Sequence, residues 1–262
     1  MDLFFRKYGK GKPLIIIHGL YGSSDNWITI GKALAEHFEV YLIDLRNHGH
    51  SPHSDEHSYA LMANDLLEFI QTQNLIKPIL IGHSMGGKTA MFFAALYADL
   101  LSKLVVIDIS PRSYQNDKLF LVSAKMHENI ITAMEKFDLS AFKSWKELEE
   151  SLPEEYNNFI GKSIFLKNIK QNANKTYSWK LNISAIKNSL PNILDGLDEN
   201  TIINIPCLFV KGANSNYILE KDAELIYKIF PQAKLETISN ASHWIHVDQP
   251  YFLITTLLNF TL

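Results

Sequence analysis

Only one cysteine, Cys207, is present among the 262 residues. An intramolecular disulfide is therefore excluded, and the apolar neighbours of Cys207 favour a buried strand residue over a reactive nucleophile. No stretch approaches the roughly 20 consecutive apolar residues of a membrane-spanning helix. The first residues also lack a charged segment followed by a long apolar run. We therefore expect no signal peptide, no membrane span and a cytoplasmic location.

Positive charge is not in excess either. Lysine and arginine number 25 against 28 aspartate and glutamate residues, which gives a formal net charge of -3. Such a chain presents no basic field for nucleic acid or for an anionic membrane surface, so we expect neither as a partner. With 47% hydrophobic and 20% charged residues, the composition is that of an ordinary globular protein. The length suffices for one large domain, or for one domain with an insertion.

Short apolar runs alternate with helical patterns along most of the chain. The runs lie at residues 13–19, 40–44, 79–81, 104–108, 206–210 and 234–239. Helical patterns lie between them at residues 26–38, 59–73 and 220–230, from Met85 onward and after Pro250. This alternation predicts an α/β fold with a mostly parallel central sheet and helices on both faces.

The alternation is interrupted between residues 112 and 200, where the pattern is helical only. Met126, Ile130 and Met134, for example, recur at helical spacing. We interpret residues 112–200 as a helical cap inserted into a core that residues 1–111 and 201–262 form.

Residues 82–86 read Gly-His-Ser-Met-Gly, between a buried strand and a helix. This pattern fits the G-x-S-x-G nucleophile elbow, a sharp turn that exposes a serine hydroxyl above the sheet. Gly82 and Gly86 are needed because a side chain at either position would collide with the neighbouring strand or helix. One alternative is a serine that merely caps the helix. A phosphate loop is another, although its G-x-x-x-x-G-K-[ST] spacing is absent. The strand before the motif and the helix after it favour Ser84 as a nucleophile.

Attack by Ser84 on a carbonyl group would place negative charge on the carbonyl oxygen, which two N–H donors must meet. The backbone N–H of Met85 lies at the start of the helix, where the helix dipole also helps. We expect the second donor in the loop after the first central strand, which begins His18-Gly19-Leu20. Our candidate is the N–H of Leu20.

A histidine is the expected general base, and the chain has 10 of them. His243 lies in a loop just after the last predicted strand, at the same sheet edge as the elbow. His246 is expected to cap or pack, because no further ligands accompany this H-x-x-H pair, and we expect no metal site. The histidine-rich residues 47–57 have loop composition and are interpreted as a solvated turn with at most one packing histidine.

The base needs an acid that fixes its tautomer and stabilises its protonated form. Asp108 ends the strand beside the elbow strand, at the edge where catalytic groups collect. Asp222 and Asp248 are the other nearby acids, but the first lies in a predicted helix and the second beyond the histidine pair. Ser215 carries no charge and could only hydrogen-bond. We predict Asp108 as the acid, and orientation of the histidine by the Ser215 loop stays open as the alternative.

Four motifs together resemble the α/β-hydrolase superfamily over nearly the whole chain. They are H-G at 18–19, D-x-R-x-x-G-x-S at 44–51, G-H-S-M-G-G at 82–87 and H-W-x-H at 243–246. The stretches "VVIDISPRSY" (105–114) and "KGANSNY" (211–217) are similar to the YbfF-type small bacterial esterases. The resemblance implies hydrolysis of esters or thioesters with short to medium acyl chains, a cap that shapes the acyl pocket, and no cofactor. It departs from the superfamily at Ser215, where most members supply an acid.

The sequence thus predicts a serine hydrolase that cleaves a small-molecule ester or thioester through an acyl-enzyme on Ser84, with His243 as base and Asp108 as acid. The residues expected to support this site are His18, Gly19, Gly82, His83, Gly86 and Ser215. Two alternatives remain. One is a C–C bond hydrolase or lyase that reuses the same three residues. The other is a ligand-binding protein on a hydrolase scaffold. Loss of one of the three catalytic residues would distinguish such a protein from an enzyme.

Overall fold

The computed structural model describes residues 1–115 and 121–262, so residues 116–120 of the predicted insertion lie outside the described residues. Seven strands form one sheet in the order β1-β3-β2-β4-β5-β8-β9. β1 pairs antiparallel with β3, and the other pairings in this sheet are parallel. The predicted mostly parallel sheet is confirmed, while β1 falls outside the predicted strands. The strands are β1 Phe5–Tyr8, β2 Lys12–Ile17, β3 Phe38–Ile43, β4 Ile79–His83, β5 Lys103–Ile107, β8 Cys207–Gly212 and β9 Ala233–Ile238.

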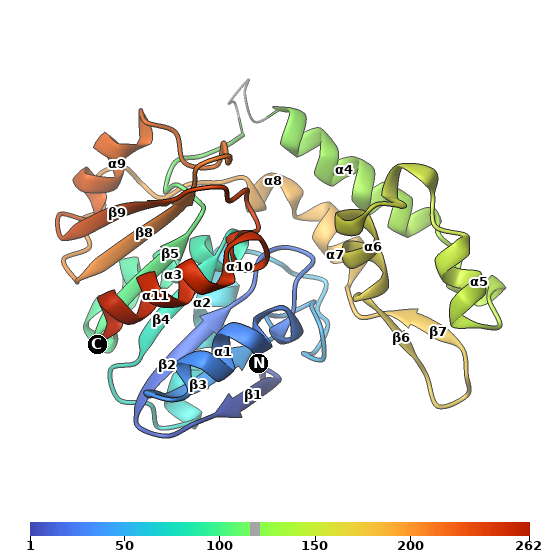
Figure 1. The fold of residues 1–262 in the computed structure, drawn as a ribbon, viewed down its shortest axis with the longest axis horizontal. Coiled ribbons are helices and arrows are strands. Elements are labelled where there is room, and N and C mark those ends of the chain that lie inside the picture. Colours follow the sequence, from blue (N-terminus) through green and yellow to red (C-terminus); the bar gives the residue numbers. More distant parts are fainter. Residues whose placement is uncertain (116–120) are drawn as a thin grey trace.

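Helices cover both faces of this sheet, as predicted (Figure 1). α1 (Ile28–Leu34) and α11 (Pro250–Thr261) pack on one face. α2 (Tyr59–Thr72), α3 (Met85–Tyr97) and α9 (Asp222–Ile229) pack on the other. Successive residues of the central strands contribute to the two layers in turn, because neighbouring side chains of a strand point to opposite faces. Both faces are apolar, which is why these strands are continuous apolar runs in the sequence.

Between β5 and β8 the chain leaves the sheet and forms a separate lobe (Figure 1). Its elements are α4 Leu121–Lys136, η3 Leu139–Ala141, α5 Trp145–Glu150, η4 Glu154–Tyr156, α6 Phe159–Leu166, β6 Ile169–Gln171, β7 Tyr177–Trp179, α7 Ile183–Asn188 and α8 Leu190–Ile193. The expectation of helices only is wrong, because β6 and β7 form an antiparallel hairpin. Each strand has 3 residues, too few for a periodicity to show. The turn is closed by Lys175, whose φ is 66° and whose N–H donates to the Asn172 carbonyl at 2.9 Å.

Elsewhere among the described residues lie three short helices, η1 Ser24–Trp27, η2 Ala98–Leu100 and α10 Ile245–Asp248. Within residues 1–115 and 121–262, no helix is both long enough and apolar enough to cross a membrane.

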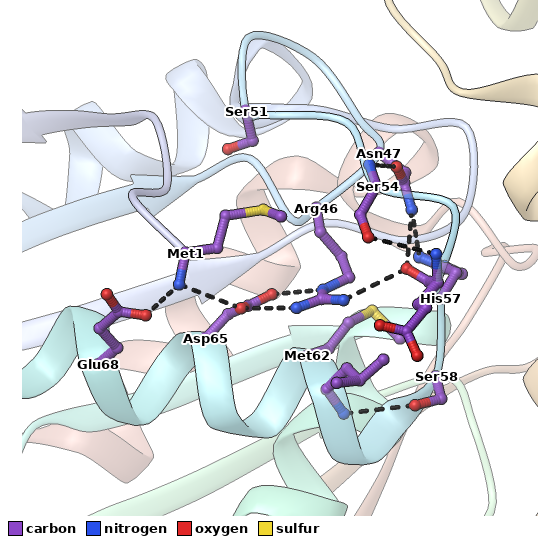
Figure 2. A network of polar contacts seen from close by, with 12 residues as sticks. Met1, Arg46, Asn47, Ser51, Ser54, His57, Ser58, Met62, Asp65 and Glu68 are labelled. Carbon is purple, nitrogen blue, oxygen red and sulfur yellow. Dashed lines mark hydrogen bonds and ion pairs between the residues drawn. The ribbon is translucent and has the colours of Figure 1, made fainter.

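The loop after β3 contains a buried network of polar contacts, and the lobe contacts this loop. The guanidinium of Arg46 donates to both carboxylate oxygens of Asp65 at 2.6 and 2.8 Å (Figure 2). His48 and His57 are only 0% and 2% exposed, so two histidines are buried where the interpretation as a solvated turn allowed for one. The His48 ring lies against those of His18 and His57, with centroids 5.1 and 5.6 Å apart. The lobe contacts this loop, since the N–H of Asn182 donates to the carbonyl of residue 47 at 3.0 Å.

Candidate active site

Ser84 lies in the sharp turn between β4 and α3. Its backbone has a φ of 53° and a ψ of -119°, a conformation that the surrounding structure must enforce. A Cβ atom at Gly82 would lie 2.2 Å from the Gly86 carbonyl oxygen, and one at Gly86 would lie 2.4 Å from that of His18. The turn therefore requires glycine at both positions. It holds the serine at the carboxyl edge of the sheet.

Ser84, His243 and Asp108 form a hydrogen-bonded chain at this edge. Oγ of Ser84 lies 2.9 Å from Nε2 of His243, and Nδ1 of His243 lies 2.8 Å from Oδ2 of Asp108. An ionised carboxylate can only accept, so Nδ1 carries the proton and Nε2 accepts the hydroxyl proton of the serine. The structure thus brings together the three residues predicted as nucleophile, base and acid. This arrangement can withdraw the proton of Ser84 as its oxygen attacks an electrophilic carbon.

Asp108 is fully buried and its oxygens are occupied by donors. The amide of Gly212 donates to Oδ1 at 3.0 Å, and the hydroxyl of Ser215 donates to Oδ2, which His243 also contacts. Such donors compensate the loss of water around a buried carboxylate. Ser215 hydrogen-bonds to the acid, so the Ser215 loop of the open alternative contacts His243 through Asp108 and through the stacked ring of Tyr217.

His83 and Tyr217 hold His243 in place. Nε2 of His83 donates to the backbone carbonyl of His243 at 2.8 Å, and burial lowers the pKa of His83 well below its usual value, which keeps this imidazole neutral. The ring of Tyr217 stacks on the His243 imidazole, with centroids 3.6 Å apart and planes 14° apart. Sequence reasoning missed Tyr217. The available cue is its place in the loop after β8, two residues beyond Ser215.

Leu20 and Met85 carry the two amides predicted as oxyanion donors. Both residues line a small cavity together with the serine. Neither amide donates to another of the described residues, so both are available to a ligand oxygen. The loop before Leu20 is braced by His18, whose Nδ1 donates to the Gly19 carbonyl at 2.8 Å and whose Nε2 accepts from the Leu45 amide at 3.0 Å.

Gly19 allows this loop to approach the His83 imidazole. A Cβ atom at position 19 would lie 2.9 Å from Nδ1 of His83 and 3.1 Å from Cβ of Ser84. All six residues expected to support the site therefore border the serine, the histidine, the acid or the loops that carry them.

The lobe contacts the loop after β2 at Tyr21, the residue that follows Leu20 and whose φ is 62°. The side-chain amide of Asn168, between α6 and β6, donates to the Tyr21 carbonyl at 2.7 Å and to the Ile164 carbonyl at 2.8 Å. The hydroxyl of Tyr21 donates to the carbonyl of His127 on α4 at 3.3 Å. Burial lowers the pKa of His127 to about 4, so its imidazole is neutral near pH 7. Asn168 and His127 are further residues that sequence reasoning missed, because only the folded lobe brings them to this loop.

Two cavities meet at Ser84. The larger has a volume of about 210 Å³ and lies between the sheet edge and helices α4 and α6. The smaller has a volume of about 30 Å³ and extends toward α8. Leu20, Ser84, His127 and Tyr217 line both cavities. A bound molecule can therefore extend from the serine in two directions.

His246 packs near the site without contacting Ser84 in any described hydrogen bond. Its ring stacks on Trp27, with centroids 4.6 Å apart and planes 22° apart. Burial lowers its pKa to about 4. These contacts fit the packing role expected for this residue.

This chain is similar to known proteins in both sequence and structure. The sequence profile of the α/β hydrolase fold family matches residues 12–250. Esterase YbfF of Escherichia coli is 31% identical over 91% of this chain and 88% of its own. The sn-1-specific diacylglycerol lipase ABHD11 of Danio rerio is 36% identical over 99% of this chain and 81% of its own. Among solved structures, a marine microorganism esterase is 48% identical, with a TM-score of 0.94 and coverage of 99% of both chains.

The expected resemblance to YbfF-type esterases is confirmed by the YbfF comparison. The fold, the elbow after β4 and the sequence profile all agree. The chain therefore belongs to the α/β hydrolase fold family.

Proposed function

We propose that this protein is a serine hydrolase that cleaves carboxylic esters or thioesters of short to medium acyl chains through an acyl-enzyme on Ser84. The observation that carries the proposal is the continuous chain from Ser84 through His243 to Asp108, with contacts of 2.9 and 2.8 Å. The names of the relatives, two esterases and a lipase, support the same chemistry. A ligand-binding protein on this scaffold would have no use for a serine hydrogen-bonded to a base that is itself bonded to an acid.

In the acylation step, Oγ of Ser84 attacks the carbonyl carbon while Nε2 of His243 takes the hydroxyl proton. The charge that develops on the carbonyl oxygen is met by the amides of Leu20 and Met85. The ionised carboxylate of Asp108 stabilises the imidazolium. His243 then gives its proton to the leaving oxygen or sulfur as the bond from that atom to the acyl carbon breaks.

In the deacylation step, water attacks the acyl carbon bound to Ser84. His243 takes a proton from this water, and the resulting tetrahedral intermediate releases the carboxylic acid as His243 returns the proton to Oγ of Ser84. The enzyme ends in its starting protonation state, with one water consumed for each ester cleaved. No other reactant is needed.

A screen of p-nitrophenyl esters and acyl-CoA thioesters of graded length tests the proposal. The wild type should hydrolyse at least one of them, and Ser84→Ala should lower the rate about 10⁴-fold or more, because it removes the nucleophile. The variant removes only a hydroxyl, so its circular dichroism spectrum should match that of the wild type. Equal turnover by the variant would contradict the role of Ser84, and no turnover of any substrate by the wild type would contradict the proposed function.

A further inference from the structure

The two cavities at Ser84 differ in which part of the reaction machinery they contain. His243 lines only the larger cavity, whereas Met85, with its candidate oxyanion amide, lines only the smaller. Ser84 and Leu20 lie on the border between the two. A carbonyl carbon bonded to Oγ of Ser84 would therefore have one cavity on the side of the base and the other on the side of the α3 N-terminus.

The position of the base decides which substituent enters which cavity. The leaving oxygen or sulfur must come within hydrogen-bond reach of Nε2 of His243 to receive its proton. The leaving group must therefore extend on the His243 side, into the larger cavity. The carbonyl oxygen turns to the amides of Leu20 and Met85, which leaves the smaller cavity for the acyl chain.

The smaller cavity has walls suited to an apolar acyl chain. Ile109, Leu190 and Ile193 contribute aliphatic surface to it. Three tyrosines also line it. Tyr59 donates to the carbonyl of residue 193 at 2.6 Å, Tyr114 donates to the Tyr217 carbonyl at 2.6 Å, and the hydroxyl of Tyr217 lies 3.5 Å from Nε2 of His127. None of its described lining residues is a lysine or an arginine, so a carboxylate on the acyl chain would lose its water there without a cation to compensate.

The larger cavity offers polar groups as well as more room. Asn26, Ser163, Lys167 and Asp248 are among its lining residues. A water-sized group needs about 10–15 Å³ of such space, so the smaller cavity, at about 30 Å³, holds about two or three groups. The larger cavity, at about 210 Å³, holds several times as many.

We propose, on the basis of the proposed function, that the acyl chain binds in the smaller cavity and the leaving group in the larger one. The preferred substrates are then short, uncharged acyl groups, from acetyl to about butyryl, on large alcohols or thiols. The selectivity for length belongs to the acyl side of the ester bond, and the alcohol side tolerates both length and polarity.

A pair of isomeric esters tests this assignment on the wild-type protein. Octyl acetate and ethyl octanoate have the same atoms and aliphatic leaving groups of similar reactivity, but they present the long chain on opposite sides of the ester bond. We expect kcat/KM for octyl acetate to exceed that for ethyl octanoate by about tenfold or more, since a single misfitting methylene already costs about that much. Equal values, or a preference for ethyl octanoate, would overturn the assignment of the cavities while leaving ester hydrolysis intact. Failure to hydrolyse these esters and p-nitrophenyl acetate alike would overturn the proposed function itself, and this inference with it.

Two matched variants locate the selectivity in the structure. Leu190→Ala enlarges the smaller cavity. It should reduce the ratio of kcat/KM for octyl acetate to kcat/KM for ethyl octanoate by about tenfold. Ile160 lines the larger cavity. Ile160→Ala should leave the dependence of kcat/KM on acyl length unchanged, while it alters the kcat/KM values of acetates with different alcohols. If Ile160→Ala shifted the acyl-length profile and Leu190→Ala did not, the acyl chain would occupy the larger cavity and the inference would be wrong.

Discussion

Asp108 combines a strained backbone with a completely buried charge. Its φ is 51°, a value that aspartate adopts more readily than most residues but still rarely, and its side chain is 0% exposed. The cost of burying the carboxylate is offset by three donors from two segments, the Gly212 amide and the Ser215 hydroxyl at the end of β8 and the His243 imidazole. One of its oxygens, Oδ2, contacts both His243 and Ser215. Ser215 therefore helps to fix the position of the Asp108 carboxylate, while the carboxylate itself contacts His243.

Asp108→Asn should lower kcat about 10⁴-fold, because an amide at this position can present a donor to Nδ1 and favour the wrong histidine tautomer. Ser215→Ala removes one of several donors to the same carboxylate and should cost far less, about tenfold. Steady-state kinetics of the two variants, with circular dichroism as a check of folding, measure the difference. If the two losses came out in the opposite order, the acid would be misplaced.

At the scale of secondary-structure elements, the important contact is that between the inserted lobe and the loop after β2. Asn168 lies between α6 and β6, is 2% exposed and donates two hydrogen bonds, one of which crosses to the Tyr21 carbonyl at 2.7 Å. This carbonyl is close along the chain to the Leu20 amide proposed as an oxyanion donor. The lobe therefore roofs the cavities and also fixes the backbone of the loop below it.

Asn168→Ala should lower kcat by about tenfold to 100-fold, because the Leu20 amide would lose its fixed position toward the developing oxyanion. The loss should appear in kcat with little change in KM and with the same acyl-length profile. Asn172→Ala, in the exposed turn of the β6–β7 hairpin of the same lobe, is the control and should behave as the wild type. A loss that appeared mainly in KM would show that Asn168 serves substrate binding instead.

Some elements could be predicted from the sequence because local chemistry decides them. The elbow is one, since only glycine at residues 82 and 86 admits the turn, and β4 is another, since a strand buried on both faces must be an apolar run. The helix expected over residues 26–38 is shorter than predicted, because Phe38 matches the helical period but begins β3. The contact of Asn182 with Asn47 could not be predicted, because it joins residues 135 positions apart in the chain.

At the scale of the whole molecule, the site lies where the core sheet and the inserted lobe meet. The core supplies Ser84, His243 and Asp108, and the lobe supplies His127 and the outer walls of both cavities. Folding buries the imidazoles of His57, His127 and His246, which are neutral in the folded protein near pH 7. Their protonation therefore opposes folding.

Stability should fall as the pH is lowered through the range in which these histidines titrate when unfolded. Burial lowers the pKa of His57, His127 and His246 from 6.5 to about 4. Between these values the unfolded chain binds more protons than the folded one, so this contribution to stability is complete above about pH 6.5 and is lost as the pH falls toward 4. Thermal unfolding at about pH 7, 6 and 5 measures the effect, in a range where most carboxylates do not yet titrate.

Two variants test whether buried imidazoles cause this pH dependence of the unfolding midpoint. His246→Phe keeps a ring against Trp27 without a titrating group, and its unfolding midpoint should depend less on pH. His37→Gln replaces an exposed histidine and should leave the dependence as in the wild type. A wild-type midpoint that did not change between about pH 7 and 5 would contradict the neutral burial of these three residues.

The most direct test of the account is the chemical identification of the acyl-enzyme. The reaction with p-nitrophenyl acetate is quenched in acid during turnover, and the peptide that carries Ser84 is examined by mass spectrometry. We predict an acetyl group on Ser84 of the wild type, and none on this peptide in Ser84→Ala. Hydrolysis that proceeds with no acetyl group on Ser84, or with the acetyl group on another residue, would contradict the account.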